Sequence, residues 1–238
     1  AVWDEATWFK YVGSWGFDEK AWEKFKLKNV KLNTADAFNW QVMGLGLRSA
    51  GNALVFSPSD FRTELFDPSY LDTVCDWWLY GVDFGYKINP SAIVKTWKVG
   101  HRLYIKQVFN ELGYLNNELA EWIINNGHGD GQFICDPAPP QGVDDLTVNG
   151  INAFPAEKGS GSVFWGLQSL KQFELVFYEN DNEIVDQIES YQWKVDKNGN
   201  FVLNSLGQRV PSPSTDHDLI DATRYGGTYF LDRNIDVE

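Results

Sequence analysis

The sequence predicts an α/β domain in which a mixed central sheet is covered by helices on both faces. Three strongly apolar runs, 77–86, 91–99 and 102–109, follow one another as strands, and the boundary near Gly100 suggests hairpins. Beyond residue 110, strands alternate with amphipathic helices, which is typical of a helix-covered sheet. Hydrophobic residues make up 43% and aromatic residues 16% of the 238 residues, enough to build a core.

Local signals place the later elements. A helix is predicted over 116–127, where Asn116 can cap the start and Gly127 suits the residue after the end. A strand over 131–136 stops at a proline-rich segment. The remaining predicted elements are a short helix ending at Gly150, strands over 151–156 and 174–179, helices over 162–172 and 181–193, a turn over 197–200, and a last helix capped by Ser214 or Thr215.

The first part of the chain differs from the rest in composition and in its secondary-structure signals. Residues 1–70 hold five of the eleven tryptophans, one short helical signal over 17–25 and a loop-like segment over 48–61. We therefore expect an irregular N-terminal arm or linker over 1–70 and one α/β domain over 71–238.

Charge and cysteine content limit the possible functions. The chain has 20 Lys and Arg against 33 Asp and Glu, a net charge of −13, which argues against a surface that wraps nucleic acid. A local basic channel, or an acidic site neutralised by cations, stays possible. Cys75 and Cys135 are too few for a disulfide framework or a thiolate zinc site. With neither a signal peptide nor a membrane span in the sequence, a cytoplasmic location is expected.

Two aspartates accompany strong strands. We place Asp83 in mid-strand, on the face that also carries Gly81 and Gly85, so that open space surrounds its carboxylate as if something must approach. The alternative is a solvated aspartate at a sheet edge, but so apolar a run predicts burial, where an unpaired charge is costly. Asp136 ends the strand over 131–136, where sites gather in open sheets; it could instead cap the following turn.

Further acids stand on the last helix. Asp218 and Asp221 are three positions apart and share a face. Asp218 could instead complete a capping box, and Asp221 could pair with Arg224. Asp216 suits the positive end of the helix dipole and is the weakest candidate for a metal ligand. His217 is expected at most to contact one of the metal-binding side chains, without binding metal itself.

Carboxylates from two strands and a helix repel one another unless a divalent cation lies among them. Hard oxygen ligands favour Mg²⁺ or Mn²⁺. Two such ions about 4 Å apart can hold the attacking water and the leaving oxygen of a phosphodiester.

Four motifs in order resemble a known family. They are GVDFGYKINPSAIV with Asp83, ICDPAPP with Asp136, AEKGSGSVFWGLQSL with Lys158, and DLIDATRY with Asp221. This series is similar to the nuclease domain of the large subunit of tailed-bacteriophage terminases, and it covers roughly 150 residues.

The resemblance implies an RNase H-like fold and a metal-dependent endonuclease that cuts double-stranded DNA with little sequence preference, using two Mg²⁺ or Mn²⁺ ions. It implies metal ligands at Asp83, Asp136 and Asp221. The position often occupied by histidine in relatives is Asp218 here, so either Asp218 or Asp221, or both, would bind metal. A glutamate found in relatives corresponds to Gln107, which is therefore not counted as a ligand.

The same resemblance suggests other parts and partners. Lys158 opens a glycine-rich loop and is expected to contact a DNA phosphate, although a solvated loop lysine is the alternative. No GxxxxGKT loop occurs in the chain, so an ATPase domain, a small subunit and a portal protein are implied as partners in the host bacterial cytoplasm, with no membrane contact.

Three other readings use the same residues differently. An actin-like or sugar-kinase-like ATPase would need further glycine-rich phosphate loops in a duplicated domain. A catalytically silent DNA-binding or scaffold module would not need the acids. A carbohydrate binder would use exposed tryptophans, yet most tryptophans here sit in apolar runs, which favours core packing.

Overall fold

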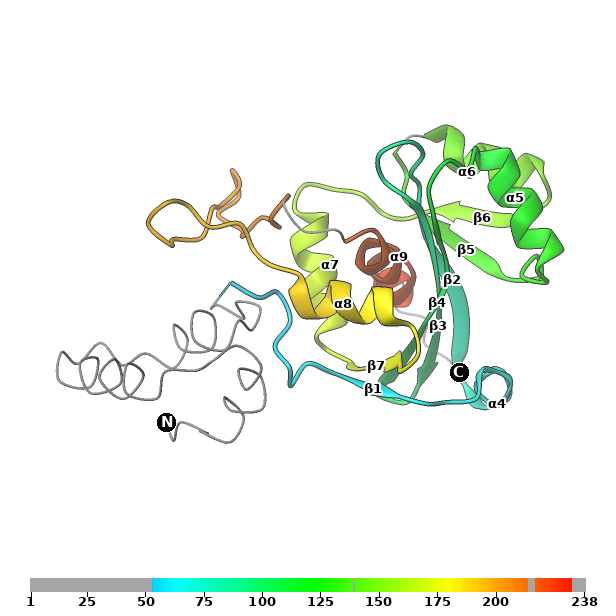
Figure 1. Cartoon of the computed structure of the whole chain (residues 1–238), viewed down its shortest axis with the longest axis horizontal. Helices are drawn as coiled ribbons and strands as arrows, with labels where there is room; N and C mark the ends of the chain where they lie inside the picture. Colours follow the sequence, from blue (N-terminus) through cyan, green and yellow to red (C-terminus); the bar gives the residue numbers. More distant parts are fainter. Residues whose placement is uncertain (1–52, 139, 214–216, 233–238) are drawn as a thin grey trace, which may run out of the picture. The chain divides into compact units, whose positions relative to one another are not determined.

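A seven-stranded mixed sheet forms the centre of the described part of the chain (Figure 1). The computed structural model describes residues 53–138, 140–213 and 217–232. The strand order is β1-β7-β4-β3-β2-β5-β6. The β2–β3 and β3–β4 pairs are antiparallel, and the β1–β7, β4–β7, β2–β5 and β5–β6 pairs are parallel. The strands are β1 (Phe61–Glu64), β2 (Trp77–Asp83), β3 (Ser91–Val99), β4 (Arg102–Glu111), β5 (Gln132–Cys135), β6 (Asn152–Pro155) and β7 (Glu174–Tyr178).

Helices cover both faces of this sheet. Leucines and isoleucines of α7, α8 and α9 pack with β3, β4 and β7 in the larger core, and α5 and α6 pack with β2, β3 and β5 in the second. The predicted α/β fold with a helix-covered mixed sheet is therefore confirmed. The helices are α4 (Pro68–Val74), α5 (Asn116–Asn125), α6 (Pro140–Val148), α7 (Ser162–Leu170), α8 (Asn182–Ser190) and α9 (Asp218–Asp232).

The continuous apolar runs arise from burial on both faces. In β3, Ala92 and Val94 belong to the core under α9, and Ile93 belongs to the core under α5. A strand covered on both sides needs no polar alternation, which explains the uninterrupted hydrophobic sequence.

The predicted helix after residue 115 is present, but its cap differs from the expected one. The residue before the helix is Leu115, whose backbone N–H donates to Glu118 Oε2 at 2.8 Å. Asn116 is thus the first helical residue rather than the cap. Gly127 has φ +76° just beyond the helix, as expected for a glycine that ends a helix.

Part of the region predicted as an irregular arm is ordered. β1 pairs in parallel with β7, and α4 begins at Pro68 with Asp67 accepting a hydrogen bond from the Ser69 N–H. The helix predicted over 17–25 lies outside the described residues, so the division into an arm over 1–70 and a domain over 71–238 stays a prediction. Among the described residues, no helix combines the length and apolar character needed to cross a membrane.

Candidate active site

Two candidate acids stand next to each other at the ends of parallel strands. Val82 of β2 pairs with Cys135 of β5, and the Asp136 N–H donates to the Val82 carbonyl at 2.9 Å. Asp83 and Asp136 each follow one residue of this pair, so they leave neighbouring strands at the same edge. The mid-strand placement of Asp83 was wrong, because β2 ends at Asp83.

The glycines beside Asp83 serve the protein's own packing. A Cβ on Gly81 would lie 1.8 Å from the carbonyl oxygen of Ala222, and one on Gly85 would lie 2.2 Å from the carbonyl oxygen of Asn89. The interpretation that these glycines leave open space was wrong. The group that approaches at Gly81 is the backbone of α9, which carries the other two acids.

Helix α9 delivers Asp218 and Asp221 to this edge of the sheet. Its buried residues, including Leu219 and Ala222, lie in the core over β3 and β4. Its start is held by Gln187 of α8, whose Oε1 accepts the Leu219 N–H at 3.0 Å. Asp218 is buried, with 8% of its surface exposed.

The electrostatics of Asp83 indicate that the four acids lie together. Burial, together with repulsion from Asp221, Asp136 and Asp218, raises the pKa of the Asp83 carboxyl to about 8. Arg224 opposes the shift only in part. Asp83 is therefore protonated at neutral pH unless a cation compensates its charge.

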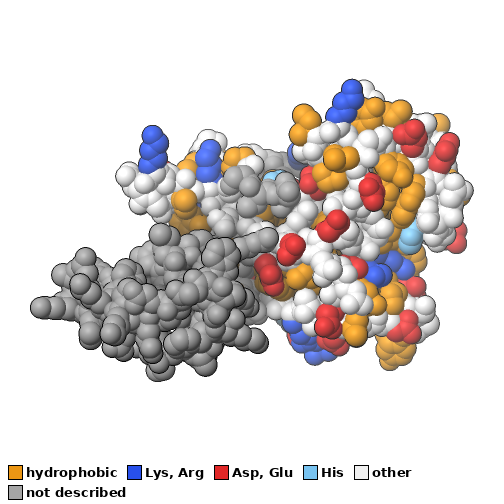
Figure 2. Space-filling view, viewed as in Figure 1, with side chains coloured by type: hydrophobic (Ala, Val, Ile, Leu, Met, Phe, Trp, Pro, Cys, Tyr) orange, Lys and Arg blue, Asp and Glu red, His pale blue; other side chains and the backbone are white. Residues whose placement is uncertain are grey.

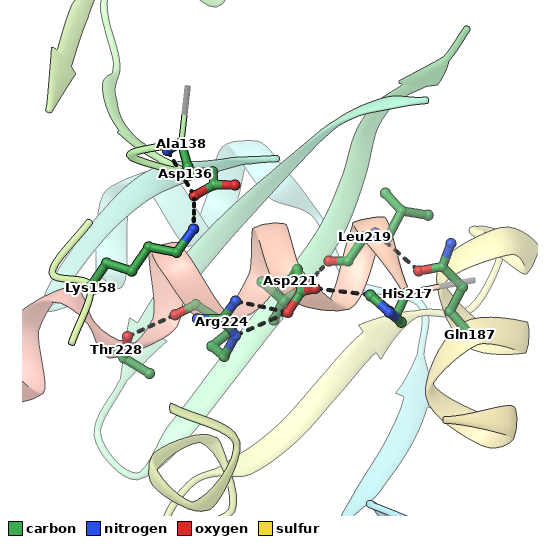
Figure 3. A network of polar contacts seen from close by, with 10 residues as sticks. Asp136, Ala138, Lys158, Gln187, His217, Leu219, Asp221, Arg224 and Thr228 are labelled. Carbon is green, nitrogen blue, oxygen red and sulfur yellow. Dashed lines mark hydrogen bonds and ion pairs between the residues drawn. The ribbon is translucent and has the colours of Figure 1, made fainter. Parts of the chain in front are cut away.

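Asp221, by contrast, is already neutralised by two side chains (Figure 3). Its Oδ1 accepts from Arg224 Nε at 3.0 Å and Nη2 at 2.9 Å, and its Oδ2 lies 2.9 Å from His217 Nδ1. Burial alone would raise the pKa of Asp221, but His217 and Arg224 outweigh it, so that this pKa is lowered. The ion pair between Asp221 and Arg224 that the sequence suggested is present.

Asp136 has one occupied and one available oxygen. Its Oδ1 accepts from Lys158 Nζ at 3.0 Å and from the Ala138 N–H at 3.1 Å (Figure 3). Within the described ranges, its Oδ2 has no protein partner and can serve a ligand. The turn-capping role considered for Asp136 is present in the hydrogen bond to Ala138, and it uses Oδ1.

Lys158 and His217 both contact candidate acids. The Lys158 side chain, half of which is exposed, joins the glycine-rich loop after β6 to the end of β5. His217 contacts Asp221, and this contact raises the pKa of His217 although burial opposes it. Asp216 and the proposed caps Ser214 and Thr215 lie outside the described residues.

Sequence reasoning missed three neighbours of the acids. Tyr191 is fully buried, and its ring lies 5.2 Å from that of His217. Burial raises the pKa of Tyr225, and the charges of Asp83, Asp221 and Asp136 add to this rise. Gln187 positions α9, as described above. Tyr191 and Gln187 lie in the helix predicted over 181–193, where no local sequence pattern distinguishes them from core residues, and Tyr225 belongs to the DLIDATRY motif but was given no role.

The donor set suits a hard divalent cation, although the acids do not converge as they stand. In the part of the chain that the structure describes, no three His, Cys, Asp or Glu side chains surround a point where a metal ion would fit. Lys158 and Arg224 each occupy an oxygen of Asp136 and Asp221, respectively. The buried Asp83 and the available oxygen of Asp136 provide carboxylate oxygens, the ligands preferred by Mg²⁺ and Mn²⁺.

Comparison with solved structures finds the same fold in a group of viral enzymes. The large terminase nuclease domain of bacteriophage SPP1, solved with bound Mn, matches with a TM-score of 0.57 and 24% identity over 70% of this chain and 94% of that one. The nuclease domain of the P22 large terminase matches with a TM-score of 0.54 and 17% identity, over 76% and 94% of the two chains. The nuclease of phage G20c with bound magnesium gives 0.55 and 14%, over 74% and 97%.

Longer relatives share only part of their length. A large terminase from a thermophilic bacteriophage, in complex with ATP-gamma-S, matches with a TM-score of 0.55 and 15% identity, and this chain spans 54% of it. No protein-family model matches the chain, and neither does any curated protein. At these identities the comparisons establish a common fold, in agreement with the resemblance seen in the motifs.

Proposed function

We propose that this protein is a metal-dependent endonuclease that hydrolyses double-stranded DNA, with little sequence preference, during packaging of a bacteriophage genome. The observation that carries the proposal is that Asp83 and Asp136 lie side by side at the ends of the neighbouring strands β2 and β5, with Asp218 and Asp221 of α9 near enough to repel Asp83. The fold shared with terminase nuclease domains supports it.

Asp83 and Asp136 are the proposed central ligands, with Asp218, Asp221 or both completing the site. Asp83 has the strongest need for a cation, because burial and three neighbouring acids oppose its ionisation. Two bound Mg²⁺ or Mn²⁺ ions would supply a water of lowered pKa and a Lewis acid at the departing oxygen. Asp83 would lose its proton as metal binds, because a carboxylate binds metal in its deprotonated form.

The remaining residues orient these ligands and the DNA. Arg224 and His217 fix the Asp221 carboxylate from two sides, so that its position changes little during the reaction. Lys158 would release Asp136 and turn to a phosphate of the bound DNA, since a lysine ammonium on an exposed loop moves at little cost.

The proposed setting is a packaging complex in the cytoplasm of an infected bacterium. Because the chain spans about half of the longer large terminases that it matches, we propose that an ATPase domain, a small subunit and a portal protein act with it. The net charge of −13 fits this division, because an acidic nuclease binds DNA weakly without other basic surfaces.

Cleavage of supercoiled plasmid tests the proposal. The wild type should nick and linearise plasmid with Mg²⁺ or Mn²⁺ and not with EDTA. Asp83→Asn should lose about 10³-fold or more of the rate, because ~4 kcal/mol of barrier lowering depends on the metal ligands. The control Asp144→Asn changes an exposed acid on α6 and should retain full activity. Metal-dependent cleavage by Asp83→Asn at the wild-type rate would reject the assignment.

A further inference from the structure

A groove of about 490 Å³ lies beside the candidate active site. It is lined by residues from the loop after β6 and from α7 and α9, two helices that pack against each other. This volume is within the range that is typical of pockets for small molecules. The residues that matter here are Lys158, Ser162, Trp165, Ser169 and Tyr229.

The lining of the groove includes none of the four candidate acids, but two of its residues contact them. Lys158 lines it and also bonds to Asp136 Oδ1, so one side chain separates the groove from this proposed metal ligand. Arg224 lines it as well and holds Asp221. A molecule in the groove therefore lies one side chain away from two of the proposed metal ligands.

An exposed indole stands in the wall of this groove. Trp165 on α7 has 61% of its surface exposed, whereas most large aromatic residues of the described part are buried or half-buried. The following residue is Gly166, where a Cβ would lie 2.7 Å from the Arg224 side chain. Close packing of α7 on α9 at Gly166 thus fixes the helix that carries Trp165.

The chemistry of the groove matches a nucleotide. Trp165 and Tyr229 offer aromatic faces, and Ser162 and Ser169 offer hydroxyl groups. The charged residues of the lining are Lys158, Arg224 and Glu157, and Lys158 is the cation on the exposed loop. Stacking on an aromatic side chain is available to every base once it leaves the double helix, whereas a paired and stacked base cannot present its face. Acidic and basic side chains both appear on the face of the described residues drawn in Figure 2.

We infer that this groove binds one unpaired nucleotide of the DNA strand next to the cleaved bond, with Trp165 stacking on its base and Lys158 contacting its phosphate. The inference rests on the proposed nuclease function, because that function places the strand at Asp136. It implies that the protein binds DNA with a few unpaired bases more tightly than fully paired DNA.

Binding without metal tests the groove separately from cleavage. Fluorescein-labelled duplexes of one length, either fully paired or with a central loop of about four unpaired nucleotides, are titrated at low salt in EDTA. The wild type should bind the looped duplex about tenfold more tightly, and Trp165→Ala should lose this preference while its affinity for the paired duplex stays unchanged. Trp165→Phe should keep most of it, because an aromatic face remains.

A matched control separates stacking from the loss of any exposed aromatic group. Tyr70 on α4 is 62% exposed, and Tyr70→Ala should bind both duplexes like the wild type. A 2-aminopurine base in the unpaired loop should be quenched by the wild type and by Tyr70→Ala, but not by Trp165→Ala. Thermal unfolding of each variant verifies that it is folded.

Three results would overturn the inference: equal affinity of the wild type for both duplexes, equal losses for both duplexes in Trp165→Ala, or no binding at the highest protein concentration. None of them depends on cleavage. If plasmid cleavage fails while the tryptophan-dependent preference holds, the nuclease proposal falls and the nucleotide site stands. If cleavage succeeds and the preference is absent, only the groove assignment falls.

Discussion

Asp83, at a strand end, and Asp221, on α9, have opposite electrostatic situations. Asp83, at the end of β2, has a pKa raised to about 8 by burial and by three neighbouring acids. Asp221, on α9, is also buried, yet His217 and Arg224 lower its pKa. Two largely buried carboxylates that repel each other therefore differ in whether the protein supplies their counter-charge.

This difference indicates what each region contributes to the site. The α9 acid is part of a completed ion-pair network and holds its shape without a ligand. Asp83, at its strand end, gains most from an added cation, because no neighbouring group offsets its repulsion fully. A cation that binds here should affect the two regions unequally, and four predictions use that inequality.

The largest expected effect on stability is a loss at α9. Asp221→Asn should reduce the free energy of unfolding by about 3 kcal/mol, because Arg224, which is 6% exposed, would keep a buried charge without its partner. Urea unfolding monitored by circular dichroism measures this value. Asp221→Asn combined with Arg224→Met removes both charges and should recover part of the loss; a single variant as stable as the wild type would contradict the argument.

The sequence predicted these regions to different degrees. The strands could be predicted, because apolar runs such as 91–99 are more hydrophobic than a loop would be. The observed strand β3 covers this same range. The strand β1 was missed, because its four residues FRTE show no clear alternation and depend on pairing with β7. Tertiary pairing of this kind leaves no local signal.

The candidate site could be predicted in composition but not in detail. Motif resemblance, strand ends and helical spacing led to the prediction of the four acids as ligands, which stays a prediction, and the repulsion felt by Asp83 agrees with their grouping. The sequence could not show why position 81 is a glycine, because the reason is the close approach of α9 to β2 at this position. The Lys158 contact of Asp136 likewise depends on the packing of separate elements, whereas the contacts of Asp221 with His217 and Arg224 follow from helical spacing.

The second effect should have the opposite sign and appear at the strand end. Asp83→Asn should raise the stability of the metal-free protein by about 2 kcal/mol at pH 8, or about 4–8 °C in Tm, because it removes a buried carboxylate that its neighbours repel. Differential scanning calorimetry in EDTA measures it. Asp144→Asn provides the exposed control, and a lower Tm for Asp83→Asn would show that repulsion does not dominate at this position.

The third prediction concerns pH and metal. Between pH 4 and about 8 the folded protein keeps a proton on Asp83 that the unfolded chain has lost, so this residue makes stability fall as pH rises. The Tm advantage of Asp83→Asn over the wild type in EDTA should therefore grow from pH 5 to pH 8 and then level off. Addition of Mg²⁺ or Mn²⁺ should raise the Tm of the wild type more at pH 8 than at pH 6, and should not raise that of Asp83→Asn. A Tm advantage that is constant with pH would contradict the assigned shift.

The smallest expected effect concerns Lys158, which tests whether an exposed cation competes with metal at the strand ends. Lys158→Gln should change the stability of the metal-free protein by less than about 1 kcal/mol, because the ion pair with Asp136 is partly solvated. The same change should lower the Mn²⁺ concentration needed for half-maximal binding a few-fold, since Asp136 would no longer be held by a competing positive charge. Isothermal titration calorimetry with Mn²⁺ measures both variants, and Lys171→Gln, which breaks an ion pair with Asp60, serves as the control. Weaker Mn²⁺ binding in Lys158→Gln than in this control would mean that the lysine supports the metal ligands instead of competing for one of them.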